Sequence, residues 1–196
     1  GRYRAGCGLP LLGVQLVGLQ TLSRNWPGQP MNRCLACEAL YTASEDTCPA
    51  CRSEVKRLEG FLTFAPQLVE AGGGFDARYF AELMRLEPGH FWFVARNELL
   101  LQIIERHARP SGRWLELGCG TGFVLEALAR RFPAVELHAS EVFIEGLRHA
   151  ARRVPDVRFM QMDARAIPFR EHFDLLGAFD VLIGINLLRE GLRAAD

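Results

Sequence analysis

The stretch W-L-E-L-G-C-G-T-G-F, residues 114–123, is an apolar run that stops in three glycines spaced two apart. Glycine adopts positive φ angles readily and has no Cβ, so such a turn can be tight and a ligand can approach its main chain closely. A helix that begins near Thr121 would point its free N–H groups into the same space. The turn therefore predicts a ligand site built from backbone, with a turn that serves packing alone as the alternative.

Three carboxylates accompany successive apolar runs: Glu116 lies within the first, Glu141 follows the second and Asp163 follows the third. The carboxyl ends of parallel strands meet at one edge of a sheet, so we expect these side chains to converge on one crevice. There Glu141 is placed to accept hydrogen bonds from two ribose hydroxyls, and Asp163 to accept one from the exocyclic amine of adenine. Taken singly, each acid is more commonly a helix N-cap or a solvated loop charge. The occurrence of all three acids at successive strands favours the ligand site.

Four cysteines form two C-x-x-C pairs separated by ten residues, namely Cys34, Cys37, Cys48 and Cys51. Four thiolates in this pattern can surround one zinc ion at about 2.3 Å per bond, which leaves no position for water or substrate, so the site would be structural. Two disulfides or a redox dithiol are the alternatives, and the absence of an adjacent βαβ pattern disfavours them. The pattern looks like a zinc ribbon, a module that docks nucleic acid or protein elsewhere. Its nearby cations are few: Arg33, Arg52, Lys56 and Arg57.

Strand and helix patterns alternate after the cysteines. Apolar runs predict strands at residues 113–117, 135–140, 157–162 and 173–179, and helical spacing predicts helices at 76–86, 90–107, 121–132 and 142–153. Alternation of this kind implies parallel strands joined by right-handed crossovers, hence a doubly wound α/β sheet. Within the long helix, the apolar residues expected along one side are Phe91, Val94, Leu99, Ile103 and Ile104.

The chain divides into five predicted parts. Residues 1–30 are expected to be an unstructured extension, from an overextended reading frame or, less favoured, a signal peptide. Residues 31–57 are the zinc ribbon, 58–75 a linker, 76–182 the α/β domain, and 183–196 an aberrant tail. The charges balance, with 23 lysines and arginines against 23 aspartates and glutamates, so no field of one sign supports nucleic acid or an anionic membrane as partner.

Four motifs together resemble the class I S-adenosylmethionine-dependent methyltransferases of the small Rossmann-like, type 11/12-like group. They are E-L-G-C-G-T-G, the acid Glu141, M-D-A-R-A-I-P-F and F-D-L-L-G-A-F-D-V-L. The segment E-P-G-H-F-W-F-V-A-R-N-E-L-L also resembles the helix before the glycine motif in a bacterial group that includes members with a zinc ribbon. The resemblance covers about residues 31–182 and implies a partial Rossmann-like methyltransferase sheet preceded by that ribbon.

The resemblance assigns cofactor contacts residue by residue. It implies that the methionine part lies against Gly118, Cys119, Gly120 and Gly122, that Glu141 holds the ribose, and that Asp163 and Ala164 border the adenine. Glu116 would orient the turn and neighbouring amines. Trp92 and Arg96 would cover the cofactor or meet its carboxylate, although packing of an amphipathic helix explains Trp92 equally well. None of the five histidines sits in a motif that marks a base, so no catalytic residue is assigned.

The similarity to the family ends after Leu182, where members continue into an acidic helix and three further strands. The sequence therefore predicts a truncated or frameshifted domain whose fourth strand is an exposed edge, and a chain that is poorly stable and inactive by itself. The predicted function of the full-length relative is methyl transfer to an unidentified acceptor, expected to be a small molecule rather than nucleic acid. The cysteine pattern predicts a reducing, cytoplasmic setting.

Two functions of other classes compete. A nicotinamide-dependent oxidoreductase predicts G-x-G-x-x-G, but here Gly122 falls one residue early and Phe123 stands where the third glycine belongs. A non-enzymatic zinc-ribbon adaptor with a degenerate α/β portion is the second.

Overall fold

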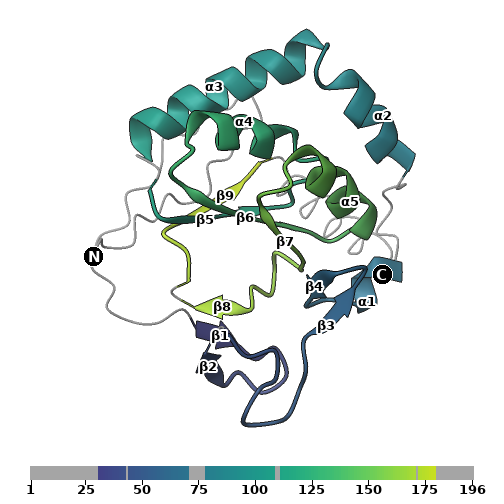
Figure 1. Ribbon diagram of the computed structural model, residues 1–196, viewed down its shortest axis with the longest axis vertical. Helices are drawn as coiled ribbons and strands as arrows, with labels where there is room; N and C mark the ends of the chain where they lie inside the picture. The colour runs from purple at the N-terminus through teal and green to yellow at the C-terminus, as the bar shows by residue number, and fades with distance from the viewer. Residues whose placement is uncertain (1–30, 43, 71–77, 109–110, 171, 180–196) are drawn as a thin grey trace, which may run out of the picture.

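The computed structural model describes residues 31–42, 44–70, 78–108, 111–170 and 172–179 (Figure 1). The predicted extension at 1–30 and the predicted tail at 183–196 lie outside these residues. Across the described segments no helix has the length and apolar character needed to cross a membrane.

Four neighbouring parallel strands of the larger sheet correspond to the predicted ones. They are β5 (Arg113–Leu117), β6 (Glu136–Glu141), β7 (Arg158–Gln161) and β9 (Leu175–Ala178), in the order β7-β6-β5-β9. Each lies within a residue or two of its predicted range, and the parallel α/β sheet is confirmed. The register pairs Leu117 with Ser140 and with Ala178, and Glu141 with Gln161, so the carboxyl ends of all four strands lie side by side.

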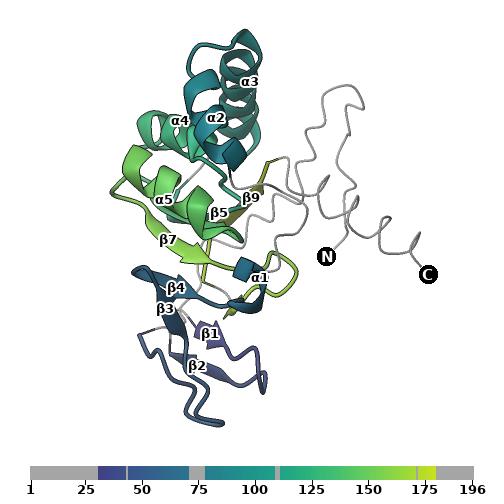
Figure 2. The same ribbon diagram turned by 90° about the vertical axis from the view of Figure 1, so that its right-hand side faces the viewer.

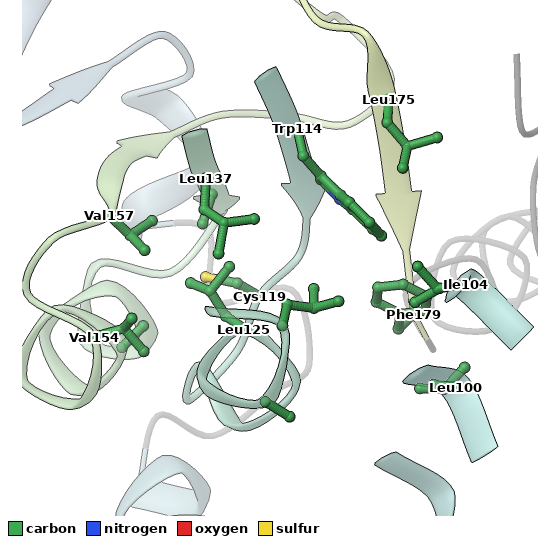
Figure 3. Close-up of a cluster of buried hydrophobic side chains, with 14 of the residues drawn as sticks. Leu100, Ile104, Trp114, Cys119, Leu125, Leu137, Val154, Val157, Leu175 and Phe179 are labelled. Atoms are coloured by element: carbon green, nitrogen blue, oxygen red, sulfur yellow. The ribbon is translucent and has the colours of Figure 1, made fainter. Parts of the chain in front are cut away.

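Helices α2 (Arg78–Leu86), α3 (Phe91–His107), α4 (Phe123–Arg131) and α5 (Ile144–Arg153) lie on one side of this sheet (Figures 1 and 2). Apolar side chains of α3, α4 and α5 meet the strands in one core cluster, which includes Trp114, Leu137 and Leu175 from the sheet, Leu125 of α4 and Ile104 of α3 (Figure 3).

The predicted apolar side of α3 is largely wrong. Phe91, Val94 and Leu99 are exposed, and the buried face is Asn97, Leu100, Leu101 and Ile104. Apolar residues occur all round this helix, so hydrophobicity alone does not identify the buried side. The contact with α4 decides it.

The opposite face of the sheet carries a second, smaller cluster that includes Leu115, Leu117, Met160, Met162 and Phe173. Among the described residues no helix contributes to it. Instead the segment that follows β7 packs there through Ile167 and Phe169.

The cysteine region is joined to the sheet by strands. It contains β1 (Met31–Arg33), β2 (Leu40–Thr42), β3 (Lys56–Leu58) and β4 (Phe61–Thr63), and the short helix α1 (Gln67–Glu70) follows. Strand β4 pairs in parallel with β7, and β3 pairs antiparallel with β4, so both extend the large sheet. Strand β1 lies between β2 and β8 (Phe169–Arg170) in a second sheet. We call residues 31–65 the Cys module.

The sequence predicts a linker at residues 58–75, but the first part of this range forms strands. Residues 58 and 61–63 are strand residues, because the F-L-T-F segment finds an unpaired edge at β7 and buries Thr63 against it.

Candidate functional site

The glycine turn has the conformation its sequence requires. Gly118, Gly120 and Gly122 have φ angles of 67°, 54° and 77°. The turn is anchored to the second strand by the Cys119 amide, which donates to the Ser140 carbonyl at 2.9 Å. A Cβ on Gly122 would stand 3.0 Å from the backbone of Ala150, whereas a Cβ on Gly120 would meet nothing within 4 Å. Gly122 therefore serves close helix packing, and Gly120 faces open space.

Glu141 closes this turn from the neighbouring strand. Its Oε2 accepts a hydrogen bond from the Gly120 amide at 3.0 Å, and its Oε1 accepts from the amides of Val142 at 2.7 Å and Phe143 at 3.3 Å. Burial raises the pKa of Glu141, and these three hydrogen bonds oppose the rise. A carboxylate offers about four lone-pair positions. The geometry therefore leaves room on Oε2 for one further donor, so that a second ribose hydroxyl would have to displace an amide.

Glu116 is a buried acid with an unused oxygen. It is 1% exposed, and its Oε2 has no hydrogen-bond partner among the described residues. Burial raises its pKa to about 8, the positive charge of Arg96 on α3 opposes the rise, and the charge of Glu141 adds to it. A carboxyl group in this setting is protonated at neutral pH and would ionise when a cation approaches.

The elevated pKa of Glu116 predicts a stability profile. Between the ordinary pKa of 4.5 and the folded value of about 8, the folded state keeps a proton that the unfolded chain has lost. The free energy of unfolding should therefore fall as pH rises through this window. Replacing Glu116 with glutamine should reduce this fall, so that the stability of the variant relative to the original chain is greater at pH 8 than at pH 5, as measured by urea unfolding. Parallel profiles for the variant and the original chain would contradict the buried, protonated state.

The third acid occupies a more open position. Asp163 follows β7, and its pKa is lowered mainly by the side chain of Arg165, whose Nη2 lies 2.7 Å from Oδ2. Ala164 between them packs with the apolar cluster on the far face of the sheet. An adenine amine would therefore have to share Asp163 with Arg165.

Helix α3 carries two further predicted residues. Arg96 exerts its charge on Glu116, while the Trp92 side chain is 44% exposed at the first turn of the helix. The turn itself is held to α3 through Asn97, whose Nδ2 donates to the Phe123 carbonyl at 3.1 Å.

A buried ionic network behind the turn was not predicted from the sequence. The side chains of Glu87 and Arg153 are each 7% exposed and approach to 2.7 Å. Thr121 in the turn donates from Oγ1 to Glu87 at 2.5 Å, and Arg153 donates to the Thr121 hydroxyl at 3.1 Å. This network ties the α2–α3 connection, the glycine turn and the end of α5 together. The E-P-G sequence gives no sign that Glu87 turns inward.

The histidines do not converge on the turn. His90 caps α3, where its Nδ1 accepts from the Trp92 amide at 3.3 Å. His138 lies on β6 and contacts the ring of Phe173 in the cluster on the far face. Among the described residues, the hydrogen-bond and ion-pair partners of His90, His138 and His149 are Trp92, Glu136 and Glu145, none of which belongs to the glycine turn.

The four cysteines come together as the spacing predicts. Their Sγ atoms all lie within 4.8 Å of one another, with Cys34 to Cys51 at 3.6 Å and Cys37 to Cys48 at 3.7 Å. Bonds of about 2.3 Å to a tetrahedral zinc ion place neighbouring sulfurs about 3.8 Å apart, whereas a disulfide requires about 2.05 Å. The donor set therefore fits a zinc ion and excludes disulfides in this state.

Comparison with known proteins matches residues 115–194 to the methyltransferase domain family. Residues 115–194 are thus similar to a methyltransferase domain. The matched range starts in β5 and includes the glycine turn, Glu141 and Asp163. It also runs into the segment predicted to be an aberrant tail, which lies outside the described residues.

Two curated methyltransferases are similar to parts of the chain. The malonyl-[acyl-carrier protein] O-methyltransferase of Bacillus anthracis is 32% identical over 99 residues, which are 48% of this chain and 36% of that protein. The trans-aconitate 2-methyltransferase of Pseudomonas aeruginosa is 52% identical over 40 residues, 20% of this chain and 14% of that protein. The chain thus spans well under two thirds of these relatives.

Among solved structures, the chain is similar to an S-adenosylmethionine-bound amino pentose methyltransferase from Micromonospora echinaspora. The alignment covers 54% of this chain and 42% of the chain of that methyltransferase. The sequence identity is 28% and the TM-score is 0.42.

Proposed function

We propose that the protein transfers the methyl group of S-adenosylmethionine to a small-molecule acceptor. The observation that carries the proposal is the hydrogen bond from the Gly120 amide to Glu141 at 3.0 Å, because it joins the glycine turn and the second-strand acid of a methyltransferase domain into one site. A pyridine dinucleotide site of the Rossmann type would instead need a third glycine where Phe123 stands.

Each part of the cofactor has a proposed partner. The methionine end lies along Gly118, Cys119, Gly120 and Gly122. The free lone pair of Glu141 accepts from the ribose, and Asp163 and Ala164 border the adenine. The unpartnered oxygen of Glu116 faces the ammonium group, which would ionise this carboxyl and offset the cost of its burial.

The chemistry asks little of the protein beyond positioning. S-adenosylmethionine supplies a methyl group on a sulfonium, so the site must bring a nucleophile in line with it and exclude water. A general base is needed only if the nucleophile starts protonated.

The proposed acceptor is a small molecule because the chain has no excess of positive charge. The names of the two curated relatives point to a malonyl group on a carrier protein and to trans-aconitate as their acceptors. Incubation with methyl-labelled S-adenosylmethionine and a panel of small acids, amines and alcohols tests the proposal. Transfer to RNA alone would contradict the acceptor class.

Because Gly120 faces open space and Gly122 packs against α5, we expect substitution of Gly120 to affect mainly ligand binding and substitution of Gly122 to affect mainly stability. Gly120→Ala should cost only the left-handed conformation, about 1–2 kcal/mol, but its methyl group enters the space proposed for the cofactor and should weaken S-adenosylhomocysteine binding. Gly122→Ala should cost about 2–4 kcal/mol, because a clash with Ala150 adds to the conformational cost. Urea unfolding and calorimetry together check the pair, and equal effects of both variants in both measurements would contradict the assignment.

We further propose that Cys34, Cys37, Cys48 and Cys51 hold one structural zinc ion. A small module with little core derives much of its folding free energy from such a metal. Elemental analysis should find about one zinc per chain. The double substitution Cys34→Ser with Cys37→Ser should abolish zinc binding. Cys119→Ser should leave the zinc content unchanged, since Cys119 lies in the glycine turn. Retention of zinc by the double variant would contradict the site.

A further inference from the structure

The Cys module pairs with the strands at both ends of one short segment. Strand β4 pairs with β7 at Leu62 to Met160 and Thr63 to Gln161, and β1 pairs with β8 at Asn32 to Phe169. Residues 162–168 connect β7 to β8, and Asp163 and Ala164 stand at their start. The segment proposed to border the adenine is therefore held at both ends by the Cys module, as Figure 1 shows for β8 beside β1 and β4 beside β7.

Arg33 strengthens the attachment at the far end. Its amide donates to the Pro168 carbonyl at 2.8 Å, and its guanidinium donates to the Ile167 carbonyl at 3.2 Å. Arg33 directly precedes Cys34, so the proposed metal site and this contact are adjacent along the chain.

Gln161 makes the attachment at the near end. Its side chain is fully buried, and its amide both accepts from the Ala65 amide at 3.0 Å and donates to the Ala65 carbonyl at 2.8 Å. The same Nε2 donates to the Val142 carbonyl at 3.1 Å. Val142 in turn donates its amide to Glu141, so one side chain links the end of the Cys module to the ribose-binding acid.

The cations of the module are partly used within the protein. Arg33 contacts Ile167, and Arg57 contacts Asp46 at 3.4 Å and the Gly60 carbonyl at 3.4 Å. These contacts disfavour a role as a platform for nucleic acid and favour one inside the methyltransferase domain.

We propose that the Cys module forms the supporting wall of the adenosine half of the cofactor site, with Gln161 and Arg33 as positioning residues. The proposal rests on the proposed function for the identity of the ligand. Loss of metal from the four cysteines loosens β1 and β4, releases residues 162–168 and the Glu141 loop, and weakens cofactor binding without disturbing the central strand β5.

Two measurements on the zinc-loaded chain test this. Calorimetry with S-adenosylhomocysteine should show affinity about tenfold weaker after zinc removal and in Gln161→Met, the equivalent of losing one or two buried hydrogen bonds. Gln102→Met is the matched control, because Gln102 is exposed and bonds to Glu98 on its own helix. Hydrogen exchange should show that zinc removal speeds exchange at residues 141–143 and 162–168 by about tenfold or more while β5 stays protected.

The outcomes separate the inference from the proposed function. If the zinc-loaded chain binds no S-adenosylhomocysteine, the proposed function fails, and hydrogen exchange still decides whether the module supports these loops. Unchanged exchange at residues 162–168 after verified zinc removal overturns the inference, as does a chain that holds no zinc. Affinity that stays within twofold in both the zinc-free chain and Gln161→Met, in a chain that binds the ligand, also overturns it.

Discussion

Replacing Arg153 with alanine is expected to lower the free energy of unfolding by about 3–5 kcal/mol, because it leaves the buried carboxylate of Glu87 without its cation. The loss also removes the donor to the Thr121 hydroxyl, so the first turn of α4 should loosen together with the glycine turn. Urea unfolding measures the change. Since an ordinary domain has only about 5–15 kcal/mol in total, this single substitution is expected to bring the chain close to unfolding.

Three further variants make the test specific. Arg152→Ala removes an exposed neighbouring cation and should change the stability by about 0.5 kcal/mol or less. Arg153→Lys keeps a charge and should lose less than the alanine variant. Glu87→Gln combined with Arg153→Met removes both charges and should recover much of the loss, as expected when neither partner is left buried alone. An alanine variant as stable as Arg152→Ala would show that the network contributes nothing.

The second large effect concerns ligand binding. Glu141→Ala is expected to weaken S-adenosylhomocysteine binding by about 10- to 150-fold, the loss of a charged acceptor worth about 1.5–3 kcal/mol. The variant also removes the partner of the Gly120, Val142 and Phe143 amides, so part of the loss comes from a looser turn.

Glu141→Gln separates the two contributions, since it keeps an acceptor oxygen and most of the shape. Its affinity should lie between those of the alanine variant and the original chain. Glu145→Ala is the control, because Glu145 forms its ion pairs with Arg148 and His149 within α5. Calorimetry measures all three. Equal affinity of Glu141→Ala and the original chain would remove Glu141 from the site.

The parallel strands and the glycine turn were predictable because local sequence determines them. Apolar runs of strand length, and glycines at three positions that need positive φ, leave few other conformations. The same holds for the cysteine quartet, where two short knuckles bring the ligands together. The confirmed order of elements, and the convergence of Glu116 and Glu141 near one turn, follow from the connection rules of parallel sheets.

The remaining features depend on tertiary contacts that no local pattern records. Glu87 and Arg153 are 66 residues apart and Gln161 and Ala65 are 96 apart, so neither pairing has a spacing that can be recognised. The inward face of α3 is chosen by Asn97 and α4 rather than by hydrophobicity. The union of β4 with β7 likewise depends on a free sheet edge, which the sequence does not display.

The central claim is that the glycine turn and its acids bind S-adenosylmethionine, and calorimetry of the chain with S-adenosylhomocysteine and with NAD tests it most directly. We expect binding of S-adenosylhomocysteine at one site and no measurable heat of binding with NAD at the same concentrations. Binding of NAD alone would contradict it.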